Sequence, residues 1–377
     1  MNAAVTAATT WFPLVPRPRP PCLSLNRRIA ELSTLAARPD EGTGQERVTR
    51  ATAVLNNAAL IASDCGVPEL ARALCHRQYE LFARSAPLPG WAVKLALQPV
   101  LNIARQLIRN GHYDDARTML HALHHAAVHR TALATGVTRV DFATLTSTTD
   151  GHREARTITW TAMLADGTRA LAAAGRWKEA AEHAAAHRGT GARLLDGRQA
   201  LILALLADGQ PLQARELVEQ ATVTEPWEHA VQAILRVLCQ RDTGQIPEPE
   251  ARAMTTAVRE LTETQDPPTA VSRTRIGLTA LDLLGETGIV QAFPLREALI
   301  VTGRTDACAA RDLLASNRLR QALTGTQRSA LQTFVRSSGL GAGSIPWHLH
   351  TQLTEAAHWA EAALQRNEVH YANARQE

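Results

Sequence analysis

Two groups of histidines have the spacing at which one helix presents several imidazoles on one face. His121, His125 and His129 recur every four residues, and His183 and His187 form a second pair of this kind. Imidazoles at this spacing can ligate one metal ion. Neither run has a glutamate between its histidines in the HExxH arrangement, and one helix rarely completes a coordination sphere. We therefore predict no metal site, and expect these histidines on partly exposed helix surfaces.

Other patterns that could indicate catalysis are weak. The glycine-rich run GLGAG at 339–343 has no preceding strand and no following Lys-Ser/Thr pair, so we expect a flexible connection there. The serines and the five cysteines show no nucleophile-elbow or protease signature. We predict no catalytic residue and no cofactor. Tertiary structure could still bring distant residues together, for example Asp166 and His152, so an enzyme with an unrecognised site stays an alternative.

The sequence pattern around these residues predicts helices. Helical periodicity runs from about Ser24 to about Arg366, and strand-like alternation is nearly absent. Valine, isoleucine, tyrosine and phenylalanine are scarce relative to alanine and leucine, which also favours helices. The chain is therefore predicted to be all-α.

Four times a glycine is followed five residues later by an alanine, between two apolar helical stretches. This spacing predicts a glycine that ends one helix and a small residue where the next helix crosses it closely. The four pairs are Gly66/Ala71, Gly111/Ala116, Gly175/Ala180 and Gly209/Ala214.

The segments LNNAALIASDCGVPELARAL and LNIARQLIRNGHYDDARTML show this pattern most clearly, and they resemble the tetratricopeptide repeat family. The marker glycines are 45, 64 and 34 residues apart, and only the last distance equals the period of that family. The resemblance covers about residues 46–226 and implies a right-handed α-solenoid of antiparallel helix pairs. We expect an extended segment at 1–23, helical repeats at 24–226, and degenerate repeats with capping helices at 227–377. One continuous superhelix is expected more than two separable domains.

In a solenoid of this family, the first helix of each pair lines the concave face. The resemblance, here to the kinesin light chain type, implies that asparagines nine residues before the glycine bind the backbone of an extended peptide. An amide suits this role because it both donates and accepts. Arginines on the same face suit carboxylate or phosphate. The predicted peptide-binding residues are Asn57, Asn102, Arg105, Arg109, Asp166 and Arg169.

The same residues have plainer roles that the sequence leaves open. Asn57 and Asn102 could cap or cross-link adjacent helices, and each arginine could belong to a solvated surface. At the N-terminus, the Pro-Arg alternation before Cys22 favours an extended segment. We expect that segment to be an unattached tail, with docking on a partner as the alternative. Trp347 and Trp359 are expected to be buried in the packing of a terminal helix, with an exposed tryptophan that anchors a partner as the alternative.

Composition narrows the function further. The net charge of +4 is small for 377 residues and shows no basic stripe, so direct nucleic-acid binding is not expected. No apolar run reaches the length of a membrane span, and the sparse cysteines fit a reducing cytoplasm. Only two lysines occur, Lys94 and Lys178, against many arginines, which is typical of GC-rich bacteria such as actinomycetes.

The sequence therefore favours a cytoplasmic, non-catalytic scaffold or adaptor. Its partner would be a protein or an extended peptide, and the arginines would suit an acidic one. The alternatives are a sensor or accessory protein of a bacterial regulatory or natural-product biosynthetic system, or an enzyme. The oligomeric state is not predicted.

Overall fold

The computed structural model describes residues 9–12, 14–38, 41–135, 138–240, 246–264, 266–285 and 289–366. Within these residues the chain is all-α, apart from one short hairpin, and consecutive helices pack in sequential pairs. The chain divides into two compact units: unit 1 is Met1–Ser24 with Leu171–Ser338, and unit 2 is Leu25–Ala170 with Gly339–Glu377. This grouping differs from the three sections expected from the sequence, whose boundaries stay a prediction.

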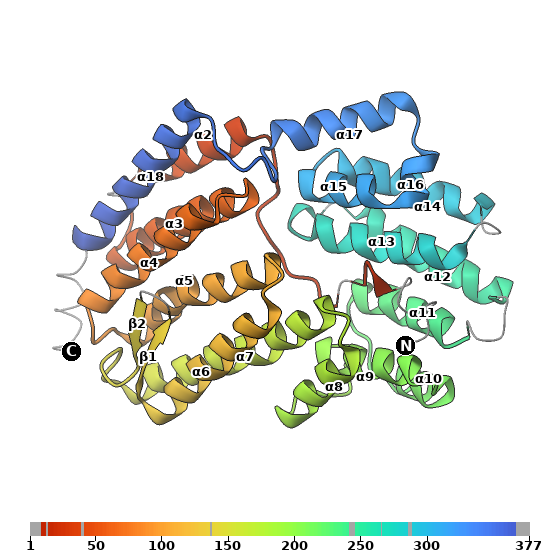
Figure 1. Ribbon diagram of the computed structural model, residues 1–377, viewed down its shortest axis with the longest axis horizontal. Helices are drawn as coiled ribbons and strands as arrows, with labels where there is room; N and C mark the ends of the chain where they lie inside the picture. Colours follow the sequence, from red (N-terminus) through yellow and green to blue (C-terminus); the bar gives the residue numbers. More distant parts are fainter. Residues whose placement is uncertain are drawn as a thin grey trace. The chain divides into compact units, whose positions relative to one another are not determined.

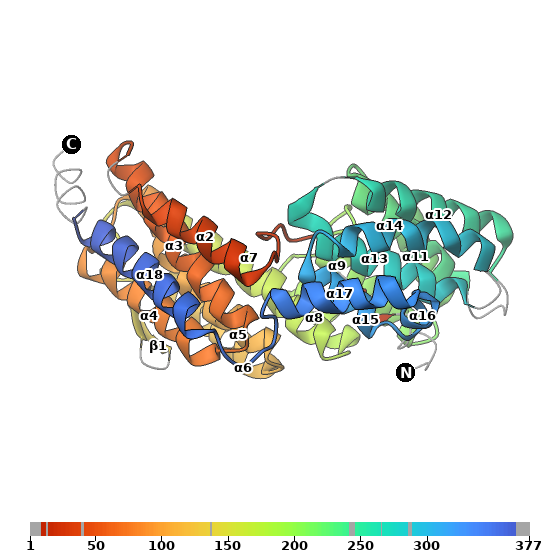
Figure 2. The same cartoon turned by 90° about the horizontal axis from the view of Figure 1, so that it is seen from above.

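Unit 2 has one apolar core, to which all of its helices contribute. Helix α18, from the C-terminal end of the chain, packs against α2, α3 and α4 (Figures 1 and 2). The elements of unit 2 are α2 (Leu25–Ala36), α3 (Gly44–Asp64), α4 (Pro68–Arg84), α5 (Gly90–Arg109), α6 (Tyr113–His129), β1 (Ala132–Thr135), β2 (Thr138–Asp141), α7 (Thr149–Ala173) and α18 (Trp347–Arg366). Unit 2 includes α7 only as far as Ala170.

Unit 1 has a core of its own, in which apolar residues of successive helices interlock. Its elements are α8 (Trp177–Ala186), α9 (Asp196–Ala207), α10 (Pro211–Glu219), α11 (Pro226–Gln240), α12 (Glu248–Glu263), the 3-10 turn η2 (Pro267–Thr269), α13 (Ala270–Leu284), α14 (Ile289–Gly303), α15 (Ala307–Ala315), α16 (Asn317–Ala322) and α17 (Gly325–Ser337). None of the helices in the described part of the chain is long and apolar enough to cross a membrane.

The four marker glycines end their helices as predicted. Gly66, Gly111, Gly175 and Gly209 all have left-handed φ values, between 72° and 83°. At Gly66, its N–H donates to the carbonyl of Ser63, and the N–H of Val67 donates to that of Ala62. These two bonds are a Schellman motif, and they recur at the other three glycines. The alanine five residues after each glycine has no exposed surface, as a small residue at a close helix crossing would have.

The glycine-rich loop at 339–343 is anchored to the end of α3. The N–H groups of Gly341 and Gly343 donate to the carbonyls of Asp64 and Cys65, both at 2.8 Å. These carbonyls lie at the helix end, where no intrahelical donor reaches them. The loop therefore caps α3, and the expectation of a merely flexible connection is wrong.

Two further expectations are wrong for the residues that the structure describes, and one feature is new. The N-terminal segment is docked on unit 1, where Phe12, Leu14 and Cys22 are buried. Trp347 and Trp359 are 81% and 58% exposed instead of buried. The antiparallel hairpin of β1 and β2 was not expected, because four-residue strands show too little alternation to be recognised.

Candidate functional site

Predicted site residues of α5 and α7 meet in a row of hydrogen-bonded side chains in unit 2. The amide of Asn102 donates to Oδ1 of Asn56 on α3 at 3.1 Å. Its own Oδ1 accepts from Nε2 of Gln98 and from Nη1 of Arg105, also at 3.1 Å. Nε of Arg105 donates to Oδ2 of Asp166 on α7 at 3.2 Å. We call these five residues the amide–arginine row, and it links α3, α5 and α7.

The sequence of α5 explains how one helix supplies most of this row. Gln98, Asn102, Arg105 and Arg109 are spaced by four, three and four residues, so they lie along one face of the helix. The apolar residues of α5 lie on its other side, in the core of unit 2. Packing of the apolar side therefore determines where the polar face points.

A second polar group lies next to the row, at the C-terminal ends of α3 and α5. Nη2 of Arg28 on α2 donates to Oδ2 of Asp64 at 2.7 Å, and both side chains are buried. Nη1 of Arg109 donates to Oγ of Ser63 at 2.6 Å and to Oδ1 of Asp64 at 3.3 Å. We call these four residues the Asp64 cluster. A buried carboxylate held by two arginines is stable only while both partners remain.

Arg105 combines a fixed position with partial exposure. Its partner Asp166 is 2% exposed, whereas the Arg105 side chain is 37% exposed. Burial, and then the nearby charge of Arg169, lower the pKa of Arg105, but a guanidinium stays protonated in proteins. Nε and Nη1 are engaged, and Nη2 donates to none of the residues that the structure describes. Arg105 therefore offers an oriented, charged donor at the surface of α5.

The structure brings together most of the predicted peptide-binding residues. Asn102, Arg105 and Asp166 belong to the row, and Arg169 lies close enough to affect Arg105. Arg109 belongs to the Asp64 cluster. The cross-linking role left open for Asn102 is the one that its contact with α3 shows.

Asn57 stands apart from its predicted companions. It is half-buried and its side chain makes no hydrogen bond to any described residue, whereas its neighbour Asn56 contacts Asn102. Sequence reasoning therefore missed Asn56, and it also missed Gln98 and Arg28. The signals available were the doubled asparagine in LNNAA and the position of Gln98, four residues before Asn102.

The histidines divide in their exposure. His125 and His129 on α6 are exposed, with ring centroids 4.3 Å apart. His183 on α8 is buried, which contradicts the expected surface position, and its ring lies 4.8 Å from that of His187. Burial lowers the pKa of His187, which favours its neutral form.

Asp166 and His152 do not converge. They lie fourteen residues apart on α7, which is about 21 Å along a helix axis. Asp166 is paired with Arg105 instead. This example of a catalytic pair formed by tertiary structure is therefore wrong.

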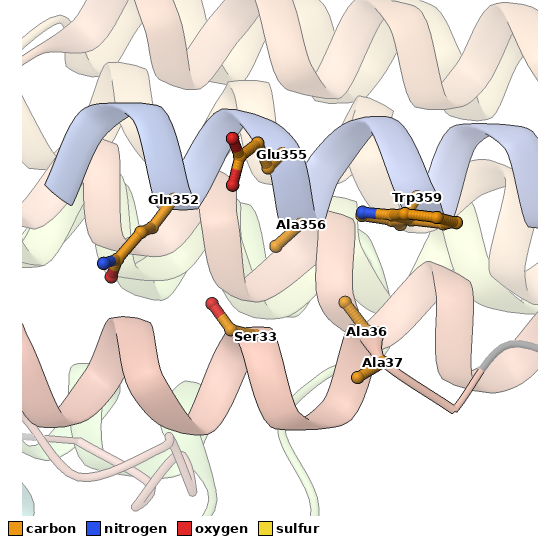
Figure 3. A pocket seen from close by; sticks show the side chains of 7 residues that line it. All are labelled: Ser33, Ala36, Ala37, Gln352, Glu355, Ala356 and Trp359. Atoms are coloured by element: carbon orange, nitrogen blue, oxygen red, sulfur yellow. The ribbon is translucent and has the colours of Figure 1, made fainter. Parts of the chain in front are cut away.

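A groove between α2 and α18 also offers space for a ligand in unit 2 (Figure 3). It has a volume of about 540 Å³ and is lined by Ser33, Ala36, Ala37, Gln352, Glu355, Ala356 and Trp359. The small side chains of the three alanines leave room for this groove, and Trp359 lies at one end of it (Figure 3). Glu355 is the one titratable group in this lining, so the groove lacks the paired acid and base that proton-transfer catalysis needs.

Comparison of the chain with known protein families, with curated proteins and with solved structures finds no match. The resemblance to tetratricopeptide repeats therefore stays a prediction, supported by the helix-end geometry of the four glycines.

Proposed function

We propose that this protein is a non-catalytic adaptor that binds an extended acidic peptide along α3, α5 and α7. In this proposal the helix pairs continue the tetratricopeptide-like pattern as a right-handed solenoid. The first helices then line its concave face, and the helices after residue 226 extend and cap it. The partner is a protein tail or peptide of negative charge.

This proposal depends on how the guanidinium of Arg105 is held in position. Its guanidinium is held by a buried carboxylate on one side and an amide on another, while Nη2 has no acceptor among the residues that the structure describes. A donor that is already oriented loses little side-chain entropy on binding, and its hydrogen bond to a carboxylate is charge-assisted.

The positive charge of the neighbouring arginines and the amide of Asn57 also favour an acidic peptide as the partner. The row and the Asp64 cluster contain Arg28, Arg105 and Arg109 but only two carboxylates, Asp64 and Asp166, and Arg169 adds a further positive charge nearby. The half-buried amide of Asn57 has the donor and acceptor that pair with a peptide unit. Together they favour a peptide whose acidic side chains meet the arginines.

The test compares peptide affinity between matched variants. The probe is a fluorescein-labelled decapeptide of alternating glutamate and alanine, with a glutamine-alanine decapeptide as its neutral counterpart. Arg105→Gln removes the oriented charge. Arg153→Gln is the control, because Arg153 lies on α7 of the same unit, is 71% exposed and, among the described residues, pairs only with Asp150 three residues before it.

We expect Arg105→Gln to raise the Kd of the acidic peptide about tenfold, the loss of one charge-assisted hydrogen bond. Asn57→Ala should also weaken binding, and Arg153→Gln should leave it within a factor of two to three. Equal affinities of the two arginine variants, or equal binding of the acidic and neutral peptides by the wild type, would refute the proposal.

A further inference from the structure

The N-terminal segment of the chain lies on unit 1 as an extended peptide. Between Leu14 and Ser24 it forms no helix or strand, and it is drawn in red in Figure 1. Five prolines stand at 13, 16, 18, 20 and 21, and these residues have no N–H to donate. These prolines prevent a regular ladder of backbone hydrogen bonds along the segment, so the remaining N–H groups and the side chains must hold it.

Three backbone N–H groups of the segment donate to acceptors that lie at, or just before, the start of a helix. The N–H of Val15 donates to Oδ1 of Asp196, the first residue of α9, at 2.8 Å. The N–H of Arg19 donates to the carbonyl of Pro268, in η2 before α13, at 3.0 Å. At α15, Asp306 accepts the N–H of Cys22 at 2.8 Å.

The contact at α15 is reciprocal. The carbonyl of Cys22 accepts the N–H of Ala307 at 2.8 Å. The other oxygen of Asp306, Oδ1, accepts the N–H groups of Cys308 and Ala309 and so caps α15. One carboxylate therefore holds both the helix end and the docked segment.

Apolar side chains anchor the segment between these contacts. Phe12 packs edge-on against Trp177 of α8, with ring centroids 6.3 Å apart. Leu14 is 2% exposed, and Cys22 is fully buried. Leu14 has a φ of 56°, a left-handed conformation that residues with a Cβ rarely adopt. The burial of its side chain must therefore stabilise this backbone conformation.

We propose that unit 1 contains a binding site for an extended, proline-containing peptide, and that residues Phe12–Cys22 are its intramolecular occupant. The observations match the usual recognition of extended peptides, in which backbone groups are bound at intervals and apolar side chains enter pockets between them. A partner segment with an apolar pair like Phe12 and Leu14, followed by prolines, competes for the same positions. The covalent link raises the effective concentration of the internal segment, so the partner binds when that segment is released.

This site goes beyond the proposed function, because it lies in unit 1 and takes a different class of peptide. None of its residues belongs to the amide–arginine row. Failure of one proposal therefore leaves the other testable with its own variants.

The test uses the full-length chain and a fluorescein-labelled synthetic peptide with the sequence of residues 9–24. Phe12→Ala/Leu14→Ala weakens the internal occupant and leaves the site intact. Asp306→Asn, added to that double variant, changes the site itself. An asparagine still caps α15 through its oxygen. Its NH₂ group, however, replaces the oxygen that accepts the N–H of Cys22, so two donors face each other there. Asp208→Asn, at an exposed position in the same unit, is the control.

We expect the double variant to bind the peptide with a Kd at least about tenfold lower than the wild type, because the internal competitor is weakened. Asp306→Asn should then raise that Kd about tenfold, while Asp208→Asn should not change it. A peptide that carries aspartate in place of Leu14 should not bind. A folded double variant that shows no saturable peptide binding would overturn the proposal.

Hydrogen exchange of the wild type decides the matter if the double variant does not fold. The proposal requires the amides of Val15, Arg19 and Cys22 to exchange by local opening, at least about tenfold faster than those in the middle of α11 and α13. Protection equal to that of these helices would mean that the segment opens only when unit 1 unfolds, and that it is part of the core and not an exchangeable occupant.

Discussion

The carboxylate of Glu228, near the start of α11, is a demanding test of how unit 1 is stabilised. Its side chain has no exposed surface. Oε1 accepts Nε of Arg193 at 3.0 Å, and Oε2 accepts Nη2 of the same guanidinium at 2.9 Å. Oε2 also accepts the N–H groups of Thr224 and Glu225 and the hydroxyl of Thr224, at 2.9 to 3.0 Å. The carboxylate thus joins the loop before α11 to the segment before α9.

These contacts determine the pKa of Glu228. Burial alone would raise it, but the hydrogen bonds from Arg193, Thr224 and Glu225 outweigh burial and lower the pKa to about 2, from an ordinary value of 4.5. A lowered pKa in the folded state means that the charged form stabilises the fold. This contribution, about 3 kcal/mol, is complete above pH 4.5 or so and is lost as the pH falls towards 2.

Glu228→Gln preserves the shape of the side chain and removes its charge. Whichever way the amide is oriented, its NH₂ group faces another donor, either Arg193 or the backbone N–H groups. We expect a loss of about 3 kcal/mol in the free energy of unfolding at pH 7, from a weakened ion pair and a buried donor without an acceptor. Glu219→Gln is the matched control, because Glu219 receives Arg236 through the same two-bond geometry but is 42% exposed. It should cost less than about 1 kcal/mol.

The measurement is urea denaturation at pH 7, 5 and 3.5, with hydrogen exchange of α11 to report on unit 1. The difference between the wild type and Glu228→Gln should be largest at pH 7. It should shrink by about 1 kcal/mol at pH 3.5, where the unfolded glutamate of the wild type gains a proton and the folded one does not. Equal losses in the two variants, or a difference that does not change with pH, would refute this account.

Three further outcomes follow from local geometry. Gly111→Ala should cost about 1 kcal/mol, because Gly111 has a φ of 83° and the space around it is otherwise open; thermal unfolding measures it, and an unchanged midpoint contradicts it. Ala116→Leu should cost about 1–3 kcal/mol by overpacking a fully buried position, and denaturation that shows no loss argues against close crossing there. Burial raises the pKa of Cys75 to about 12 and that of Cys239 to about 11, so neither thiol should react with Ellman's reagent at pH 8 before urea is added. Rapid labelling of either cysteine in the native protein would contradict this.

The helix ends and the polar face of α5 could be predicted from the sequence because their causes are local. A Schellman motif needs one residue with positive φ and closes its bonds within five residues, so a glycine such as Gly111 marks it directly. Gln98, Asn102 and Arg105 share a face because of helical periodicity alone. The sequence was therefore sufficient to place these polar side chains together on one face of α5.

The identity of the residues that meet across helices could not be predicted in the same way. A shift of one residue rotates a side chain by about 100° around a helix, so the rotation of α3 in the packed unit decides that Asn56, and not Asn57, contacts Asn102. The pairing of Arg28 with Asp64 depends likewise on how α2 packs against α3.

The largest departures from the sequence predictions involve segments that are far apart in the chain. Val15 and Asp196 are separated by 181 residues, and Cys22 and Asp306 by 284. Nothing in the Pro-Arg alternation of the N-terminal segment specifies a surface to receive it. Local sequence determined where helices begin and end, because those hydrogen bonds close within one turn. The tertiary structure alone decided which distant surfaces meet, because that depends on the packing of every helix between them.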